Sequence, residues 1–178
     1  MKAVKHLIEQ CIKQDRAAQK QLYLRHADHI MHTARRYAQD EAEAKDILQN
    51  TFVRIFYALE QFDQDKGNFK AWISRICINE AIAIKRKKKP IYFPEDTSDL
   101  LDTPIENEAI GSLTGEEIKR VVRLLEPGYQ LIMQLYFYDE LKTNEIAELL
   151  NLKESSVRSK ISRARQKFIN HWKMSNSL

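Results

Sequence analysis

Apolar residues recur at helical spacing over most of the chain's 178 residues. Residues 4–12 place them on one stripe, which predicts a first helix ending near Gln14. Asp15 is suited to cap a second helix that runs to about Tyr37. The third run, from about residue 41 to 60, has the cleanest period in the chain, so we expect it to form a central core helix.

The helical period stops at residues 62–68, FDQDKGN, where Asp, Lys and Gly predict an exposed loop. Asn68 is suited to cap a fourth helix, which runs from Phe69 to about Lys89. That helix ends in the basic run KRKKK before Pro90, a residue that cannot continue it.

The second half of the chain predicts four further helices. Thr114 and Glu117 match a capping box that opens the first of them, and another is expected over about residues 129–138. Residues 141–172 then predict a helix-turn-helix. Thr143 is suited to cap its first helix, and Asn151 stands where the turn needs a residue at positive φ. Its second helix, from about residue 154, carries apolar residues at spacings of four, three and four.

Composition and charge divide these helices into two groups. Few glycines and prolines, with many good helix formers, favour an all-α fold. The net charge is only +4, yet basic residues cluster at 85–89 and 153–173, while residues 91–117 contain no Lys or Arg. We therefore predict an acidic, flexible linker at 91–112 between an N-terminal domain, residues 1–90, and a C-terminal domain, residues 113–174. Whether the linker is only a spacer stays open.

Several classes of protein are disfavoured. Cys11 and Cys77 form no CxxC pair, which indicates neither a disulfide framework nor a cysteine-rich metal site and fits the cytoplasm. No apolar run reaches membrane-spanning length, and the N-terminus does not resemble a signal peptide. His26, His29 and His32 recur every three residues, but such steps carry them around the helix, so packed or solvated histidines are expected rather than a metal site.

Three polar surfaces are candidates for binding. The second helix of the predicted helix-turn-helix has a basic, serine-rich face, which favours contact with phosphates and base edges in the major groove over a merely solvated face. Its candidate DNA-binding residues are Ser155, Ser156, Arg158, Ser159, Lys160, Ser162, Arg163 and Lys167.

The second surface joins the loop at 62–68 to the helix that follows it. Exposed backbone, an aromatic ring, polar side chains and cations together could hold unstacked bases of a single strand, although Trp72 can be a core residue or serve partly in both roles. The candidates here are Asp63, Lys66, Gly67, Asn68, Trp72, Arg75, Asn79, Lys85 and Arg86. The third surface is the polar face of the third helix, suited to contact another protein and formed by Asp46, Gln49, Asn50 and Arg54.

Taken in this order, the segments resemble the bacterial RNA polymerase sigma factors of the extracytoplasmic-function (ECF) group, within the sigma-70 family. The resemblance rests on AKDILQNTFVRIF at 44–56, FKAWISRICINEAIAIKRKKK at 69–89 and the stretch from Leu125 to Phe168. It implies, respectively, a helix that binds core RNA polymerase, a segment that melts and reads the minus 10 promoter element, and a domain that binds the minus 35 element. Asn50 departs from the family, which commonly has a carboxylate there.

The function that the resemblance implies is promoter-specific transcription initiation, with core RNA polymerase, promoter DNA and an anti-sigma factor as partners. One alternative is a dimeric helix-turn-helix regulator that acts without polymerase, which leaves the surfaces at 44–56 and 69–89 without a role. A second is a metal enzyme built on the three histidines. Because the sequence offers no nucleophile and base pair, no phosphate-binding glycine loop and no metal cluster, we expect neither enzymatic activity nor a cofactor.

Overall fold

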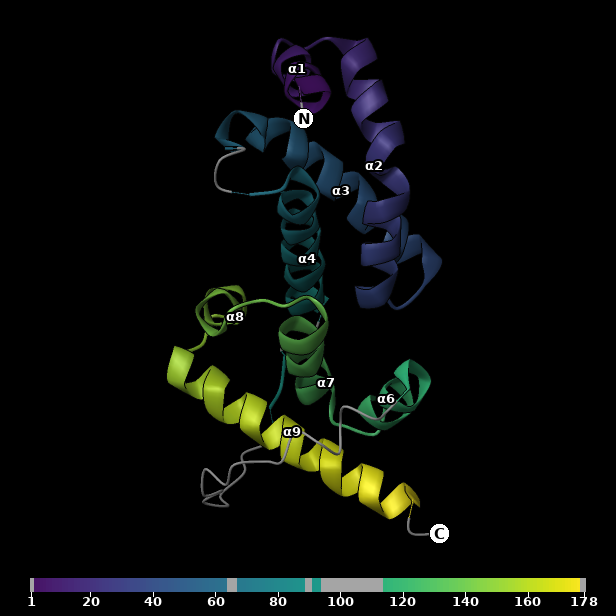
Figure 1. The fold of residues 1–178 in the computed structure, drawn as a ribbon, viewed down its shortest axis with the longest axis vertical. Coiled ribbons are helices and arrows are strands. Elements are labelled where there is room, and N and C mark those ends of the chain that lie inside the picture. Colours follow the sequence, from purple (N-terminus) through teal and green to yellow (C-terminus); the bar gives the residue numbers. More distant parts are fainter. Residues whose placement is uncertain (1, 64–66, 89–90, 94–113, 177–178) are drawn as a thin grey trace. The chain divides into compact units, whose positions relative to one another are not determined.

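The computed structural model describes residues 2–63, 67–88, 91–93 and 114–176. All the regular structure among these residues is helical (Figure 1). The chain divides into two compact units, residues 1–89 and 90–178, and each is described by itself. The predicted all-α fold with two helical domains is therefore confirmed.

The N-terminal unit contains α1 (Lys2–Ile12), α2 (Arg16–Tyr37), α3 (Glu41–Ala58), the short 3-10 helix η1 (Leu59–Gln61) and α4 (Phe69–Lys88). Helices α2, α3 and α4 each pack against the other two, and α1 packs on α2 (Figure 1). Their shared core is apolar, with Ile30, Ile55 and Ile73 fully buried. Burying each such side chain stabilises the folded unit by about 1.5–3 kcal/mol relative to leaving it exposed to water.

Two predicted caps fix where these helices begin. The Asp15 carboxylate accepts hydrogen bonds from the backbone N–H groups of Ala17, at 2.7 Å, and Ala18, at 3.0 Å. Asn68 does the same for α4, because its side-chain oxygen accepts from the backbone N–H of Lys70 at 2.8 Å. Both N-cap predictions are confirmed. The cap at Asn68 sets the direction in which α4 leaves the loop.

The C-terminal unit contains α6 (Gly115–Val122), α7 (Pro127–Met133), the π-helical turn η2 (Gln134–Tyr138), α8 (Thr143–Leu150) and α9 (Glu154–Asn176). Helices α6, α7 and α8 all pack on the long helix α9 (Figure 1). The predicted capping box is present at the start of α6, where Thr114 and Glu117 exchange hydrogen bonds.

The helix-turn-helix is formed by α8 and α9, and its turn is as predicted. Asn151 has φ 55° and ψ 49°, the left-handed conformation that Asn tolerates better than other non-glycine residues. The predicted cap at Thr143 is wrong. Thr143 is the first helical residue, and Lys142 holds the N-cap position. The Glu145 carboxylate accepts a hydrogen bond from the backbone N–H of Lys142 at 2.8 Å. The Thr143 hydroxyl donates a hydrogen bond to Glu154 instead of capping its own helix.

Residues 91–93 belong to the C-terminal unit, although we assigned them to the linker. A Cβ atom on Gly128 would lie 2.5 Å from the Tyr92 carbonyl oxygen and 2.8 Å from the Phe93 ring, so only glycine lets this segment rest on α7. Phe93 also meets the Tyr129 ring edge to face, with 6.1 Å between centroids. The rest of the predicted linker, from residue 94 to 112, lies outside the described residues.

None of the helices that the structure describes combines the length and the apolar character of a transmembrane span.

Candidate polymerase and DNA interfaces

Helix α3 presents its predicted binding face to solvent. Its buried stripe includes Ile47 and Ile55, and Asp46, Gln49 and Asn50 lie exposed on the opposite side. Arg54 differs from the other candidates, because its guanidinium forms an ion pair with Glu80 of α4. Arg54 is therefore already engaged in a contact between α3 and α4 within the N-terminal unit.

The same face of α3 carries two exposed apolar residues that the sequence analysis missed. Val53 is 54% exposed and Tyr57 is 85% exposed. They follow Asp46 at helical intervals of seven and eleven residues, so all three share one side of α3. The sequence carries a signal for both residues, because Val53 and Tyr57 are apolar but lie off the apolar stripe of this helix.

The start of α4 is organised by three aromatic rings. Phe62 lies 5.0 Å from Phe69 and 5.2 Å from Trp72, measured between ring centroids. Phe69 is buried and packs in a T-shaped arrangement with the His26 ring, with 5.3 Å between the ring centroids, whereas Trp72 is half-buried. Trp72 is therefore both part of this cluster and partly open to solvent, next to the loop that contains Asp63.

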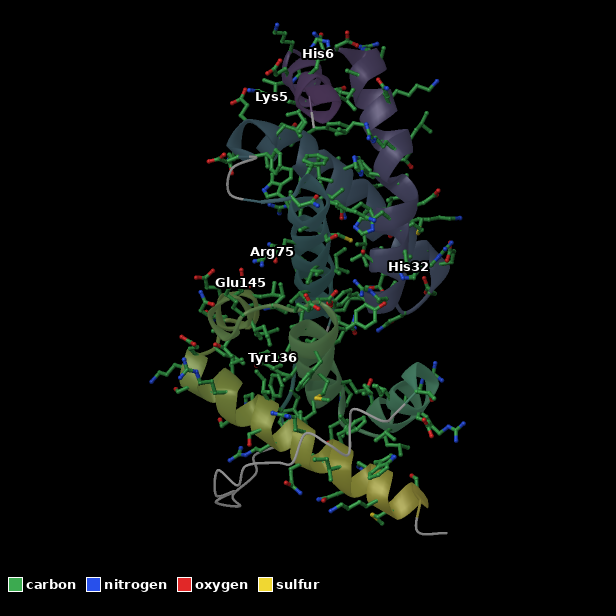
Figure 2. The ribbon with its side chains drawn as sticks, viewed as in Figure 1. Lys5, His6, His32, Arg75, Tyr136 and Glu145 are labelled. Atoms are coloured by element: carbon green, nitrogen blue, oxygen red, sulfur yellow. The ribbon has the colours of Figure 1, made fainter. Side chains whose placement is uncertain are left out.

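Arg75, Asn79 and Arg86 continue this surface along α4. They follow Trp72 at intervals of three, seven and fourteen residues, which places them on one face of the helix, and all three are exposed. Arg75 projects from α4 in Figure 2. Gly67 and Asn68 are exposed in the loop, and the remaining candidate, Lys66, lies outside the described residues.

A buried carboxylate holds the basic end of α4. Glu43 of α3 is only 7% exposed, and its Oε1 atom lies 3.0 Å from the Nζ atom of Lys88. Its Oε2 atom accepts the backbone N–H of Gln39. Burial by itself would raise the pKa of the Glu43 carboxyl, but these two contacts hold that pKa below its usual value. Lys85 is half-buried, and this burial lowers its pKa.

The N-terminal half of α9 places most of its predicted DNA-binding residues toward solvent. Val157 and Ile161 face the core, while Ser155, Arg158 and Ser159 are exposed. The other candidates Ser156, Ser162 and Arg163 are half-exposed.

The two lysines among the predicted DNA-binding residues are engaged within the C-terminal unit. The Nζ atom of Lys160 lies 4.5 Å above the centre of the Phe93 ring, and partial burial lowers the pKa of Lys160. Lys167 forms an ion pair with Glu126 at 2.9 Å and also lies over the Tyr129 ring. Both lysines lie on the same side of α9, beside α7 and residues 91–93.

Nothing in the described residues supports a metal site. No group of three or more His, Cys, Asp or Glu side chains there is arranged to hold a metal ion. Instead, His29 shares a 2.7 Å hydrogen bond with Ser74 of α4, and His26 packs on Phe69. These histidines serve the packing between α2 and α4.

The chain has two helical units, and one of them contains a helix-turn-helix whose second helix is basic and exposed. This combination is typical of a class of DNA-binding proteins. Comparison with known proteins identifies the family. Residues 22–91 match the family described as Sigma-70 region 2, and residues 115–168 match Sigma-70, region 4.

Known relatives agree with these matches over nearly the whole chain. The chain is 29% identical to the ECF RNA polymerase sigma factor SigW of Bacillus subtilis, covering 92% of this chain and 93% of SigW. It is 28% identical to the RNA polymerase sigma factor CnrH of Cupriavidus metallidurans, covering 83% and 82% of the two chains. A solved structure of CnrH in complex with the cytosolic domain of CnrY superimposes with a TM-score of 0.50, at 26% identity, over 92% of this chain and 93% of that one.

The chain therefore belongs to the sigma-70 family, in its ECF group. It is a transcription initiation factor, and the dimeric regulator that acts without polymerase is not favoured.

Proposed function

We propose that this chain binds core RNA polymerase through α3 and recognises promoter DNA with α4 and α9. The observation that carries the proposal is that the three exposed surfaces fall, in order, within the two matched regions. The N-terminal domain, residues 1–90, would then act at the minus 10 element and the C-terminal domain, residues 113–174, at the minus 35 element, with the acidic segment 91–112 as their linker.

The polymerase surface consists of Asp46, Gln49 and Asn50 together with Val53 and Tyr57. Exposed apolar side chains among polar ones are typical of a protein interface, because water is excluded around an aromatic anchor while the polar rim fixes orientation. Tyr57, at 85% exposure, has the most area to lose on binding. Arg54 contributes by holding α3 against α4 through Glu80.

The minus 10 surface consists of Asp63, Lys66, Gly67 and Asn68 in the loop and Trp72, Arg75 and Asn79 on α4. An unpaired base offers its hydrogen-bonding edge and its ring face, which a duplex hides. The half-buried Trp72 ring and the exposed Asn79 amide supply a stacking surface and a polar group within two turns of one another. Arg86 and Lys85 follow along the same helix toward the phosphates.

The minus 35 surface consists of Ser155, Ser156, Arg158, Ser159, Lys160, Ser162, Arg163 and Lys167 on α9. Short serine side chains let a helix lie close to base edges, and the cations neutralise phosphates on either side. For Lys160 and Lys167, contact with DNA requires that they leave the Phe93 and Tyr129 rings.

An anti-sigma factor is the further partner that we propose. The solved CnrH structure contains the cytosolic domain of CnrY, and a structure of the same fold, at 21% identity and a TM-score of 0.52, is described as RpoE with the anti-sigma factor NepR from Bartonella quintana. A chain that works on polymerase acts in the cytoplasm. It needs no enzymatic activity or cofactor of its own, because polymerase performs the chemistry.

Reconstitution with core RNA polymerase tests the proposal. The chain should direct transcription from a defined start site, and a permanganate footprint should report unpaired thymines in the minus 10 element. Binding to palindromic DNA as a dimer, without any effect on polymerase, would overturn it.

Matched variants then assign the surfaces. Replacing Asp46 and Gln49 together with Ala should weaken polymerase binding and leave thermal unfolding almost unchanged. Asn79→Ala should impair strand opening or change base preference at constant salt dependence, whereas neutralising Lys85 to Lys88 should weaken binding to all sequences and flatten that dependence. Full opening and unchanged base preference in Asn79→Ala would place the melting site elsewhere.

A further inference from the structure

The first residue of α9 carries a carboxylate that the candidate DNA surface does not include. The Oε1 atom of Glu154 accepts two hydrogen bonds, from the Thr143 hydroxyl at 2.6 Å and from Nη2 of Arg158 at 2.7 Å. The Oε2 atom takes part in neither. Thr143 opens α8, so Glu154 connects the first helix of the helix-turn-helix to an exposed arginine of the second.

A carboxylate at this place needs an explanation. In a helix-turn-helix, the N-terminal residues of the second helix approach the bases, between two phosphate strands that repel negative charge. Glu154 is nevertheless held ionised, because the hydrogen bonds from Thr143 and Arg158 lower its pKa, against the opposing effect of partial burial. It is therefore purely a hydrogen-bond acceptor at neutral pH.

Among the major-groove edges, cytosine matches such an acceptor. Cytosine presents the N4 amine as a donor, whereas guanine and thymine present carbonyl oxygens that repel a carboxylate. Adenine also has an amine, but its neighbouring N7 atom is an acceptor that a carboxylate cannot satisfy. An ionised Glu is thus selective for cytosine.

Arg158 matches the partner of that cytosine. A guanidinium donates two parallel hydrogen bonds to O6 and N7 of guanine, the commonest specific contact of this kind. Residues four apart on a helix are separated by about 6 Å along its axis, and stacked bases by about 3.4 Å. Glu154 and Arg158 can therefore reach the two bases of one pair or of two adjacent pairs.

We propose that Glu154 and Arg158 read a C·G base pair, or two adjacent pairs containing these bases, in the upstream promoter element. Glu154 accepts from the cytosine N4 amine, and Arg158 donates to guanine O6 and N7. Thr143 is a positioning residue, because its hydroxyl holds the Glu154 carboxylate from α8. The inference rests on the proposed function, since it requires α9 in the major groove.

A purely structural role for Glu154 makes a different prediction. If the carboxylate only joined α8 to α9, or only complemented the positive N-terminal end of α9, its loss would weaken binding to every promoter equally. If Glu154 instead contacts a base, its loss changes the base preference at one or two positions of the upstream promoter element and leaves the other positions unchanged.

The test uses the full-length chain with core RNA polymerase and a pool of promoter duplexes. Sequences are first selected from a randomised pool with the unaltered chain, and every single-base change is then made in the selected upstream element. We expect Glu154→Gln to reduce the preference for cytosine at one position by roughly fivefold or more and to favour adenine there, because an amide matches adenine N6 and N7. Glu148→Gln, an exposed charge-matched change on α8, is the control and should alter no position.

Arg158→Lys is the second variant, and it keeps the charge at an exposed position in case Glu154→Gln folds poorly. It should lower the preference for guanine in the same or the adjacent pair, because an ammonium lacks the planar pair of donors. Unchanged base preference in both variants, or an equal loss at all positions, would overturn the inference. If the unaltered chain directs no promoter-dependent transcription, the proposed function fails instead.

Discussion

Helices α4 and α9 both carry rows of cations, but the two units hold them differently. In the N-terminal unit the acid is internal, because Glu43, which pairs with Lys88, is 7% exposed. In the C-terminal unit the acids are at the surface, since Glu126 and Glu154 have side chains about 40% exposed where they pair with Lys167 and Arg158.

This difference determines what a phosphate has to displace. Taking Lys88 from Glu43 leaves a buried carboxylate without its cation, which is costly in the interior of a protein. Taking Lys167 from Glu126 exposes both partners to water, so the exchange is almost neutral. The basic end of α4 thus stabilises the fold in addition to its proposed contact with DNA, whereas the cations of α9 could exchange their partners for phosphates at little cost.

The largest expected effect comes from removing the internal acid. Glu43→Ala should lower the free energy of unfolding of the N-terminal unit by about 2 kcal/mol, because it deletes the ion pair with Lys88 and the hydrogen bond to the Gln39 N–H group. Denaturant unfolding followed by Trp72 fluorescence, in a Trp172→Phe background, measures this loss.

Glu126→Ala is the matched control in the C-terminal unit, followed by Trp172 in a Trp72→Phe background. It should cost about 0.5 kcal/mol or less, as is usual for a surface pair. Equal losses in the two variants would remove the distinction between the units.

A smaller effect is expected where a ring, rather than an acid, holds a cation of α9. Phe93→Ala should destabilise the C-terminal unit by about 1 kcal/mol, since it removes the contacts with Tyr129 and Lys160. Tyr92→Ala is the control, because the Tyr92 side chain is 68% exposed. Unfolding followed by Trp172 should separate the two variants, and identical curves would show that residues 91–93 do not stabilise this unit.

The smallest effect is the pH dependence of the N-terminal unit. Burial, followed by Arg25, His29 and Lys70, lowers the pKa of His26 below its ordinary value of 6.5. Burial, with Lys70, Arg36 and His32, does the same for His29. On acidification, His26 and His29 take up protons in the unfolded chain at a higher pH than in the folded unit. The stability that these two neutral histidines contribute is therefore complete above about pH 6.5, and it is lost as the pH falls through their lowered pKa values.

Unfolding of the N-terminal unit at pH 7.5 and pH 5.5 checks this sign. The unaltered chain should be less stable at pH 5.5, and a His26→Gln, His29→Gln variant should show a smaller difference between the two pH values. Greater stability of the unaltered chain at pH 5.5 would mean that these histidines gain protons on folding.

Local patterns in the sequence predicted the helices and most of their boundaries. Asp15, Asn68 and the Thr114 and Glu117 pair cap the helices that they were predicted to cap, because a cap depends on residues within one turn. Asn151 takes the predicted left-handed conformation for the same reason. The exposed faces of α3, α4 and α9 also followed from helical periodicity, since opposite sides of one helix are fixed by sequence spacing.

Only the tertiary structure decided which charges are shared between elements. The pairing of Glu43 with Lys88 joins residues 45 positions apart, and that of Lys167 with Glu126 joins residues 41 apart, distances over which local periodicity carries no information. For the same reason the sequence placed residues 91–93 in the linker, although the Phe93 ring packs beneath Lys160 and beside Tyr129. The prediction at Thr143 was wrong in a related way, because its hydroxyl had two partners within reach, its own helix end and Glu154 of the next helix. The choice between them depends on how α8 and α9 pack, and that is settled by the burial of apolar side chains from both helices rather than by either sequence segment alone.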